Sequence, residues 1–275
     1  MRTQLGIFVL FFMLPFAVFS QDGIYSAGAR ANALGNASVA LPDHWSIFNN
    51  VGALGGSSGS SVLVSYLNRY QMGQGFQSIA AGYLHDFGDI KVGASAFQFG
   101  DQLFNENKIG LAYSHKINFV SLGVQVNRLQ YSVEGFGTAA TYVVELGGLV
   151  MVTSELHFGA YIYNINQANI SSDLQEKVPT IMRAGFSYLP AESLLFTLQL
   201  TQDIDYNTSI QGGIEYAIIP ELRFRTGVST HPFINHFGLG FTPKKFEVDY
   251  SFINNDMLGM THQLSLGFKF NQTDE

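Results

Sequence analysis

The chain has 275 residues, a net charge of −7, only 13% charged residues and no cysteine. Its excess of acidic side chains argues against a nucleic-acid partner, because phosphate binding needs clustered lysine and arginine. The same excess leaves no polybasic patch for anionic lipid, and the lack of cysteine excludes a disulfide framework. Aromatic residues and glycine are abundant, with 24 Phe, 13 Tyr and 29 Gly.

Residues 1–20 have the pattern of a secretory signal peptide. Arg2 supplies the positive charge, an apolar run extends from Leu5 to Phe19, and Val18 and Ser20 are small residues before a cleavage site. The apolar run is shorter than the roughly 20 residues of a spanning helix. We therefore expect the chain to be exported and the signal peptide to be removed, and no later segment resembles a transmembrane helix.

Residues 21–59 are rich in small and apolar residues but do not alternate in polarity. A disordered tail is usually polar and charged, which this segment is not. We predict that it folds as a hatch, or plug, inside the structure that residues 60–275 form.

From residue 60 onward, short segments alternate between apolar and polar residues, as in Leu264–Phe270. Successive strand side chains point to opposite faces, and in an outer-membrane barrel the apolar face meets lipid while the polar face lines the lumen. The pattern predicts fourteen strands, an even number as in bacterial barrels, at 60–70, 76–87, 89–99, 106–117, 119–131, 138–152, 156–166, 180–189, 194–203, 208–217, 222–230, 236–241, 246–253 and 263–271.

The predicted connections differ between the two rims of this barrel. Those after the even-numbered strands are short, whereas the other rim carries longer links such as Ala168–Val178 and Asn254–Thr261. Short periplasmic turns and longer outer loops are typical of outer-membrane barrels. The prediction is thus an all-β, transmembrane antiparallel barrel of about 14 strands in the bacterial outer membrane, with an N-terminal hatch in its lumen.

Glycines recur on the face that the alternation assigns to the lumen. Two explanations remain open: they relieve strand curvature, or they make room for a chain segment inside the barrel. The set is Gly82, Gly93, Gly110, Gly123, Gly147, Gly159, Gly185, Gly213, Gly227, Gly238 and Gly267.

The predicted hatch resembles a known family. Its first part matches a G-A-R-A-x-x-x-G-x-A-x-V-A segment. In its second part, Asp43, Asn49 and Gly52 match the aspartate, asparagine and glycine of a segment that ends in N-P-A-G-L, with Asn50 where proline is usual and Ala53 where leucine is usual. These segments resemble the hatch of FadL-type outer-membrane barrels, which include fatty acid transporters and the PorV/PorQ proteins of type IX secretion. The resemblance implies fourteen strands and a luminal hatch. The hatch residues that we single out are Gly28, Arg30, Gly35, Asp43, Trp45, Asn49, Asn50 and Gly52.

Charged residues also fall on the predicted inner face. They are either cross-strand ion pairs that keep the lumen polar, or a selectivity lining or docking surface for the hatch. The set is Arg183, Glu215, Arg223, Arg225, Glu247, Asp249 and Lys269.

No motif points to catalysis, a metal or a cofactor. The sequence has no H-E-x-x-H and no phosphate loop. His231, His236 and His262 are placed on separate outer loops without metal-ligand spacing. We expect a non-enzymatic protein without a cofactor.

Two functions remain after these exclusions. The first, favoured by the brief loops and the W-S-x-F-N-N hatch, is a PorV/PorQ-like accessory role in type IX secretion or surface attachment, with secretion-system or cargo proteins as partners. The alternative is a FadL-like transporter of hydrophobic solutes, which needs an apolar pocket and a hydrophobic ligand. Inward apolar residues available for that pocket are Leu63, Leu84, Phe97, Phe99, Leu129, Tyr161 and Tyr163.

Overall fold

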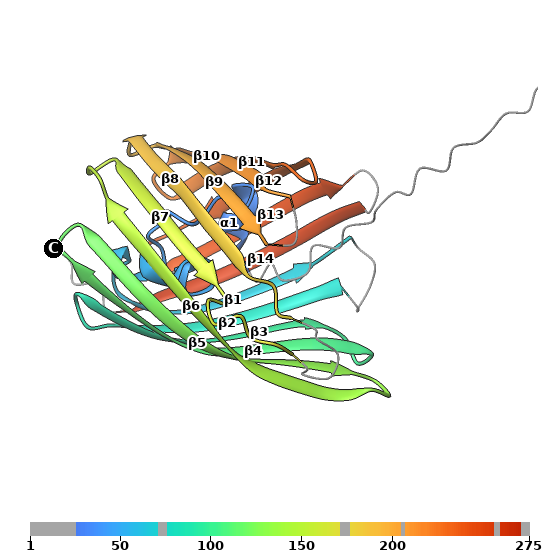
Figure 1. The fold of residues 1–275 in the computed structure, drawn as a ribbon. Coiled ribbons are helices and arrows are strands. Elements are labelled where there is room, and N and C mark those ends of the chain that lie inside the picture. The colour runs from blue at the N-terminus through green and yellow to red at the C-terminus, as the bar shows by residue number, and fades with distance from the viewer. Residues whose placement is uncertain (1–25, 71–75, 171–176, 205–206, 256–258, 271–275) are drawn as a thin grey trace, which may run out of the picture.

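The computed structural model describes residues 26–70, 76–170, 177–204, 207–255 and 259–270, so the predicted signal peptide lies outside the described residues. Fourteen antiparallel strands form one closed barrel in which each strand pairs with its neighbours in sequence and β1 pairs with β14 (Figure 1). The predicted all-β barrel is therefore confirmed. The strands are β1 (Ser60–Asn68), β2 (Gln77–Asp86), β3 (Ile90–Gly100), β4 (Phe104–Ile117), β5 (Val120–Val133), β6 (Gly137–Met151), β7 (Leu156–Tyr163), β8 (Ile181–Ala191), β9 (Leu194–Asp203), β10 (Ser209–Ile219), β11 (Leu222–Ser229), β12 (Ile234–Phe241), β13 (Phe246–Asn255) and β14 (Gly259–Phe270).

The alternation of polarity sets the two faces of the wall. On β1, Val62, Val64 and Tyr66 are exposed on the outside, whereas Ser61 and Ser65 are buried on the inside. The same alternation around the barrel produces an outer surface of large apolar side chains. Such a surface is stable in contact with lipid and costly in contact with water.

The two rims differ less than the sequence indicated. The rim where even-numbered strands end, called the short-turn rim below, has the links 87–89, 118–119, 152–155, 192–193, 220–221 and 242–245. The far rim has the long links 69–76 and 164–180, but its links 101–103 and 134–136 are short. The predicted loop from Asn254 to Thr261 is wrong at both ends, because Asn254 pairs with Met260 and Asn255 with Gly259 in the ladder.

The ladder between β6 and β7 covers only part of β6. It begins at Leu146↔Ile162, so the part of β6 nearer the far rim has no backbone partner in β7. The predicted strand 156–166 ends at Tyr163, because Asn164 adopts a φ of 58°. The Asn166 side chain pairs with the β6 backbone at the seam between β6 and β7, beyond the end of their ladder. Its Oδ1 accepts from Val144 N at 2.9 Å and its Nδ2 donates to Tyr142 O at 2.9 Å.

Residues 26–59, the luminal segment, lie inside the barrel (Figure 1). They form helix α1 (Ala29–Ala33), the single turn α2 (Ser46–Asn49) and the 3₁₀ helix η1 (Val51–Gly56). None of the helices in the described ranges is long and apolar enough to cross a membrane.

Several inward glycines make room for the backbone of the luminal segment. A Cβ atom added at Gly159 would lie 2.1 Å from Val39 O, and one at Gly227 would lie 2.3 Å from Gly35 N. At these positions the second explanation for the glycines is supported. It does not extend to Gly110, where an added Cβ would meet the side chain of Asn127 instead.

Candidate functional site

Two glycines of the predicted hatch motif allow the luminal segment to pack closely. Gly28 has a φ of 100°, and a Cβ atom there would lie 2.8 Å from Cδ2 of Trp45. Gly35 has a φ of 70°, and a Cβ atom there would lie 2.6 Å from Val228 O on β11. Both positions combine a left-handed backbone with a close contact, so they require glycine.

Two asparagines of the motif hold the second half of the segment. The Asn49 amide accepts from Ala27 N at 3.2 Å and donates to Ala27 O at 3.1 Å. Asn50 donates from Nδ2 to Val39 O at 2.6 Å and to Gly148 O on β6 at 3.1 Å. The amide at position 50 therefore joins the segment to the wall.

Contact at Gly52 is closer still. A Cβ atom there would lie 2.2 Å from the carbonyl carbon of Gly147. The Gly52 carbonyl accepts a hydrogen bond from Ser121 Oγ at 2.6 Å. Ala53 and Leu54 are fully buried where η1 packs against β5 and β6.

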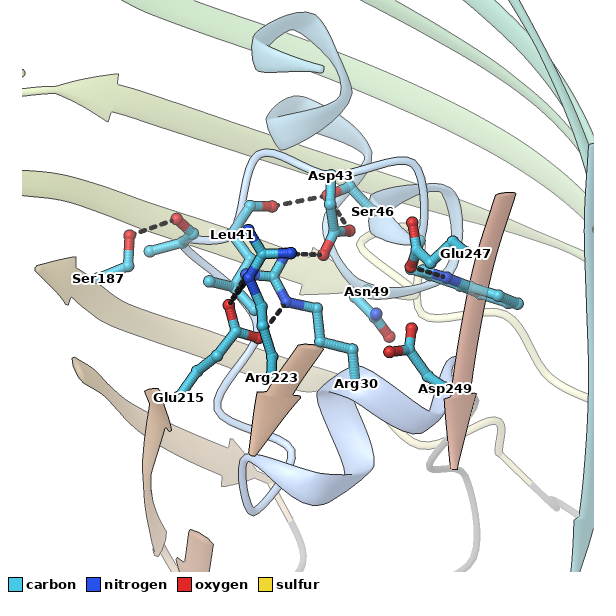
Figure 2. A network of polar contacts seen from close by, with 12 residues as sticks. Arg30, Leu41, Asp43, Ser46, Asn49, Ser187, Glu215, Arg223, Glu247 and Asp249 are labelled. Atoms are coloured by element: carbon cyan, nitrogen blue, oxygen red, sulfur yellow. Dashed lines mark hydrogen bonds and ion pairs between the residues drawn. The ribbon is translucent and has the colours of Figure 1, made fainter. Parts of the chain in front are cut away.

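Arg30 ties α1 to the wall and to the rest of the segment. Its Nε donates to Glu215 Oε2 at 2.8 Å and its Nη2 to Glu215 Oε1 at 2.9 Å, while its Nη1 donates to Asp43 Oδ2 at 3.1 Å. Figure 2 shows Glu215 of β10 below the guanidinium and Asp43 above it. A planar guanidinium that donates two parallel hydrogen bonds to one carboxylate fixes the position and the orientation of both side chains.

Glu215 accepts from further arginines on the neighbouring strand. Arg225 Nε lies 2.5 Å from Glu215 Oε2, and Arg223 Nε lies 3.6 Å from Oε1. Arg225 also bonds Asp249, two strands away. Gly240 lies between them, and a Cβ atom there would be 2.5 Å from both side chains. The missing side chain on β12 thus allows an ion pair to cross from β11 to β13.

Glu247 and Lys269 complete this charged network next to the single tryptophan. Trp45 Nε1 donates to Glu247 Oε1 at 3.2 Å, and Lys269 Nζ lies 3.8 Å from Glu247 Oε2. Six of the seven charged residues predicted to line the lumen are therefore close together on β10, β11, β13 and β14. The seventh, Arg183 on β8, lies apart with its guanidinium 5.4 Å from the ring centre of Tyr161.

Burial changes the acid–base behaviour of the luminal segment. Burial alone would lower the pKa of Arg30. The Glu215 and Asp43 carboxylates raise it by more, so the pKa lies well above its usual value. Burial raises the pKa of Asp43, and Arg30 only partly opposes that rise. Burial and the charge of Lys269 lower the pKa of His44 to about 4. His44 is therefore neutral at pH 7, and its Nε2 can donate to Ser58 O at 3.0 Å.

A second buried ion pair lies on the opposite wall and was not singled out in the sequence. Lys108 Nζ lies 3.1 Å from Glu145 Oε1, and both side chains are 1% exposed. Glu145 also accepts from Tyr161 Oη at 2.8 Å and from Asn127 Nδ2 at 2.8 Å. The sequence does contain a signal for this pair, because the alternation of polarity places Lys108 of β4 and Glu145 of β6 on the inner face of the barrel.

Apolar side chains cover one side of the lumen between the luminal segment and the far rim. Seven of these residues, called the apolar wall below, are Phe97, Phe99, Leu129, Tyr131, Val143, Tyr161 and Tyr163, all on β3 and β5–β7. They belong to one cluster that also includes Trp45, Phe48, Leu63 and Leu84. Towards the far rim the apolar wall continues to Phe104, whose ring centre lies 6.4 Å from those of Phe99 and Tyr131.

The facing side of the lumen, on β9–β14, is polar. Inward residues there include Thr201, Ser209, Gln211, His236 and Gln263. The prediction that His236 occupies a loop is wrong: it lies buried on β12, with Nδ1 3.2 Å from Asn32 Oδ1 of α1. No cluster of His, Asp and Glu suited to a metal ion occurs among the described residues.

A cavity of about 290 Å³ lies near the short-turn rim, between the luminal segment and the wall. The charged side chains at its surface include Arg30, Asp43, Arg223, Glu247 and Lys269. Its volume is at the lower end of the range for small-molecule sites.

Comparisons with known proteins identify the fold. No family model matches the sequence, and no curated protein matches it. Among solved structures, the toluene transporter TodX of Pseudomonas putida superposes with a TM-score of 0.68 at 11% identity, covering 91% of this chain and 100% of its own. The CymD monoaromatic hydrocarbon channel gives 0.66 at 11% identity, covering 90% and 99%. A Pseudomonas aeruginosa FadL homologue gives 0.59 at 13% identity, covering 90% and 98%.

None of these three structures is named as a PorV or PorQ protein, so that part of the resemblance receives no support from them. The identities are low, and what the three structures share with this chain is its architecture. The chain has the fold of the FadL-type barrels.

Proposed function

We propose that the protein is a non-enzymatic channel that carries small hydrophobic solutes across the bacterial outer membrane. This is the alternative of the two functions considered from the sequence. The solved structures with the same fold include a toluene transporter and a monoaromatic hydrocarbon channel. This likeness favours a channel for hydrophobic solutes over a role in secretion.

The observation that carries the proposal is the one-sided lining of the lumen. An apolar solute leaves water favourably for an apolar surface, at about 25 cal/mol per Å² of buried area. The apolar wall runs in continuous contact from Phe104 to Trp45 of the luminal segment. A water-filled pore for polar solutes is expected to have a polar lining all the way around.

Charges within the apolar wall do not break its continuity. Lys108 and Glu145 neutralise each other, and the Glu145 oxygens also accept hydrogen bonds from Tyr161 and Asn127. The Lys108 ammonium lies 5.3 Å from the ring centre of Tyr163, a favourable cation–π distance. Paired in this way, the two charges cost less than an isolated ion would in an apolar site.

Substitutions on the two sides of the lumen test the proposal. Gram-negative host cells expressing the protein are given radiolabelled toluene, and initial uptake is measured for the wild type, Leu129→Gln and Gln211→Asn. Leu129→Gln places an amide in the apolar wall and should reduce uptake, whereas Gln211→Asn keeps the chemistry of the polar side and should not. Equal uptake by all three variants, at equal amounts of folded barrel, would overturn the proposal.

A further inference from the structure

The cavity at the short-turn rim is lined by as many acidic as basic side chains, but these side chains differ in how many hydrogen bonds they make. The acids at its inner end are engaged: Glu215 accepts from Arg30 and Arg225, and Asp43 accepts from Arg30. Glu247 accepts from Trp45. Carboxylates engaged in this way have little capacity left for a ligand cation.

Two cations at the same cavity are much less engaged. Arg223 Nε lies 3.6 Å from Glu215, and Lys269 Nζ lies 3.8 Å from Glu247, both beyond hydrogen-bond distance. The side chains remain partly exposed, at 30% and 23%. Within the described part of the chain, neither side chain donates a hydrogen bond. Arginine carries five N–H donors and lysine three, so both side chains have N–H groups available to a ligand.

The other side of the cavity carries apolar side chains. Leu189 of β8 and Leu195 of β9 line it, together with Pro42 of the luminal segment and Ala217 of β10. The link between β8 and β9 adds the polar residues Glu192 and Ser193 to the lining. Arg223 and Lys269 come from β11 and β14. A ligand in this space would meet the side chains of Arg223 and Lys269 at one end and leucine side chains at the other.

We propose that this cavity binds a small organic carboxylate, with the anionic group on Arg223 and Lys269 and an apolar body against the leucines. A carboxylate accepts the charge-assisted hydrogen bonds that these two cations do not make within the protein. The volume of about 290 Å³ admits a single aromatic ring with one carboxylate. The site is separate from the apolar wall, and its existence does not depend on transport of hydrophobic solutes.

Equilibrium dialysis of the purified barrel against radiolabelled benzoate tests the proposal. We expect saturable binding of one benzoate, with a Kd of about 1 mM or tighter. Neutral benzamide, unlabelled, should not displace it, and acetate should displace it only at higher concentration, because acetate lacks the apolar ring. The fluorescence of Trp45, the only tryptophan in the chain, should change with benzoate, because its indole bonds Glu247 at the cavity.

Arg223→Gln and Lys269→Gln should each weaken benzoate binding by about tenfold, the effect of one charge-assisted hydrogen bond. Arg128→Gln is the matched control, because Arg128 is exposed and bonds only Gln130 on the outer surface. Leu189→Asn should weaken benzoate binding but not acetate binding. Absence of saturable benzoate binding, displacement by benzamide, or unchanged affinity in both charge variants would overturn the proposal. Toluene uptake is a separate readout, so failure of the proposed channel function would leave the dialysis result intact.

Discussion

Arg30 of the luminal segment and Glu215 of β10 are joined by two parallel hydrogen bonds of 2.8 and 2.9 Å. Glu215 accepts from Arg225 as well, so one carboxylate compensates more than one buried guanidinium. Removing one partner of a buried pair leaves the other charge uncompensated, at a cost of about 3–5 kcal/mol. The link is therefore a principal anchor of the segment.

Glu215→Gln should release the luminal segment more readily than Arg30→Gln. The first change leaves the charge of Arg30 balanced by Asp43 alone, whereas the second leaves Glu215 paired with Arg225. The measurement uses Ser38→Cys as a reporter, because Ser38 is 2% exposed and the chain has no native cysteine. Labelling of the reporter by an impermeant maleimide should increase from wild type to Arg30→Gln to Glu215→Gln. Equal labelling of the three would show that the pair does not anchor the segment.

Gly147→Ala should displace η1, whereas Gly148→Ala should not. A Cβ atom at Gly147 would lie 2.0 Å from Asn50 Oδ1 and 2.7 Å from Gly52 N. At Gly148, on the outward face, the nearest atom is Leu122 Cδ2 at 3.3 Å, the end of a flexible side chain. The Ser38→Cys reporter distinguishes the two variants, and similar labelling in both would contradict the close contact.

Acidification should loosen the luminal segment through His44. The folded pKa is about 4 and the unfolded value about 6.5, so below pH 6.5 the released state binds more protons than the docked state. The contribution of His44 to docking is then lost as the pH falls from 6.5 towards 4, by about 2 kcal/mol at pH 5. Quenching of Trp45 fluorescence by acrylamide should increase over this range in the wild type and much less in His44→Gln. A flat wild-type profile would show that His44 does not titrate between the two states.

Asn166→Ala should open the seam between β6 and β7. Val144 N loses its acceptor, Asn166 Oδ1 at 2.9 Å, and an unmade hydrogen bond costs about 1–3 kcal/mol. Hydrogen exchange at Val144 should accelerate by about tenfold or more. Asn107→Ala removes a side chain that bonds only Asn105, so exchange at Val144 should stay at the wild-type rate there. Unchanged exchange in Asn166→Ala would mean that another group protects this amide.

The sequence predicted the features that depend on parity along single strands. Alternation placed Arg225 and Asp249 on the inner face, but it did not pair them, because their contact crosses β12 and depends on Gly240 and on the registers of three strands. The role of Asn166 was missed for a related reason: an asparagine after a strand reads as a loop residue until the length of β6 relative to β7 is known. Strand ends at the far rim were misplaced where hairpins continue beyond apolar runs, as at Asn255 and Gly259.

The most direct test of the proposed function compares the uptake of radiolabelled toluene with that of a sugar in the same Gram-negative host cells, with and without the protein. The apolar wall and the filled lumen predict that expression increases the initial rate of toluene entry and leaves sugar entry unchanged. Unchanged toluene entry, or an equal increase for both solutes, would contradict a channel for hydrophobic solutes.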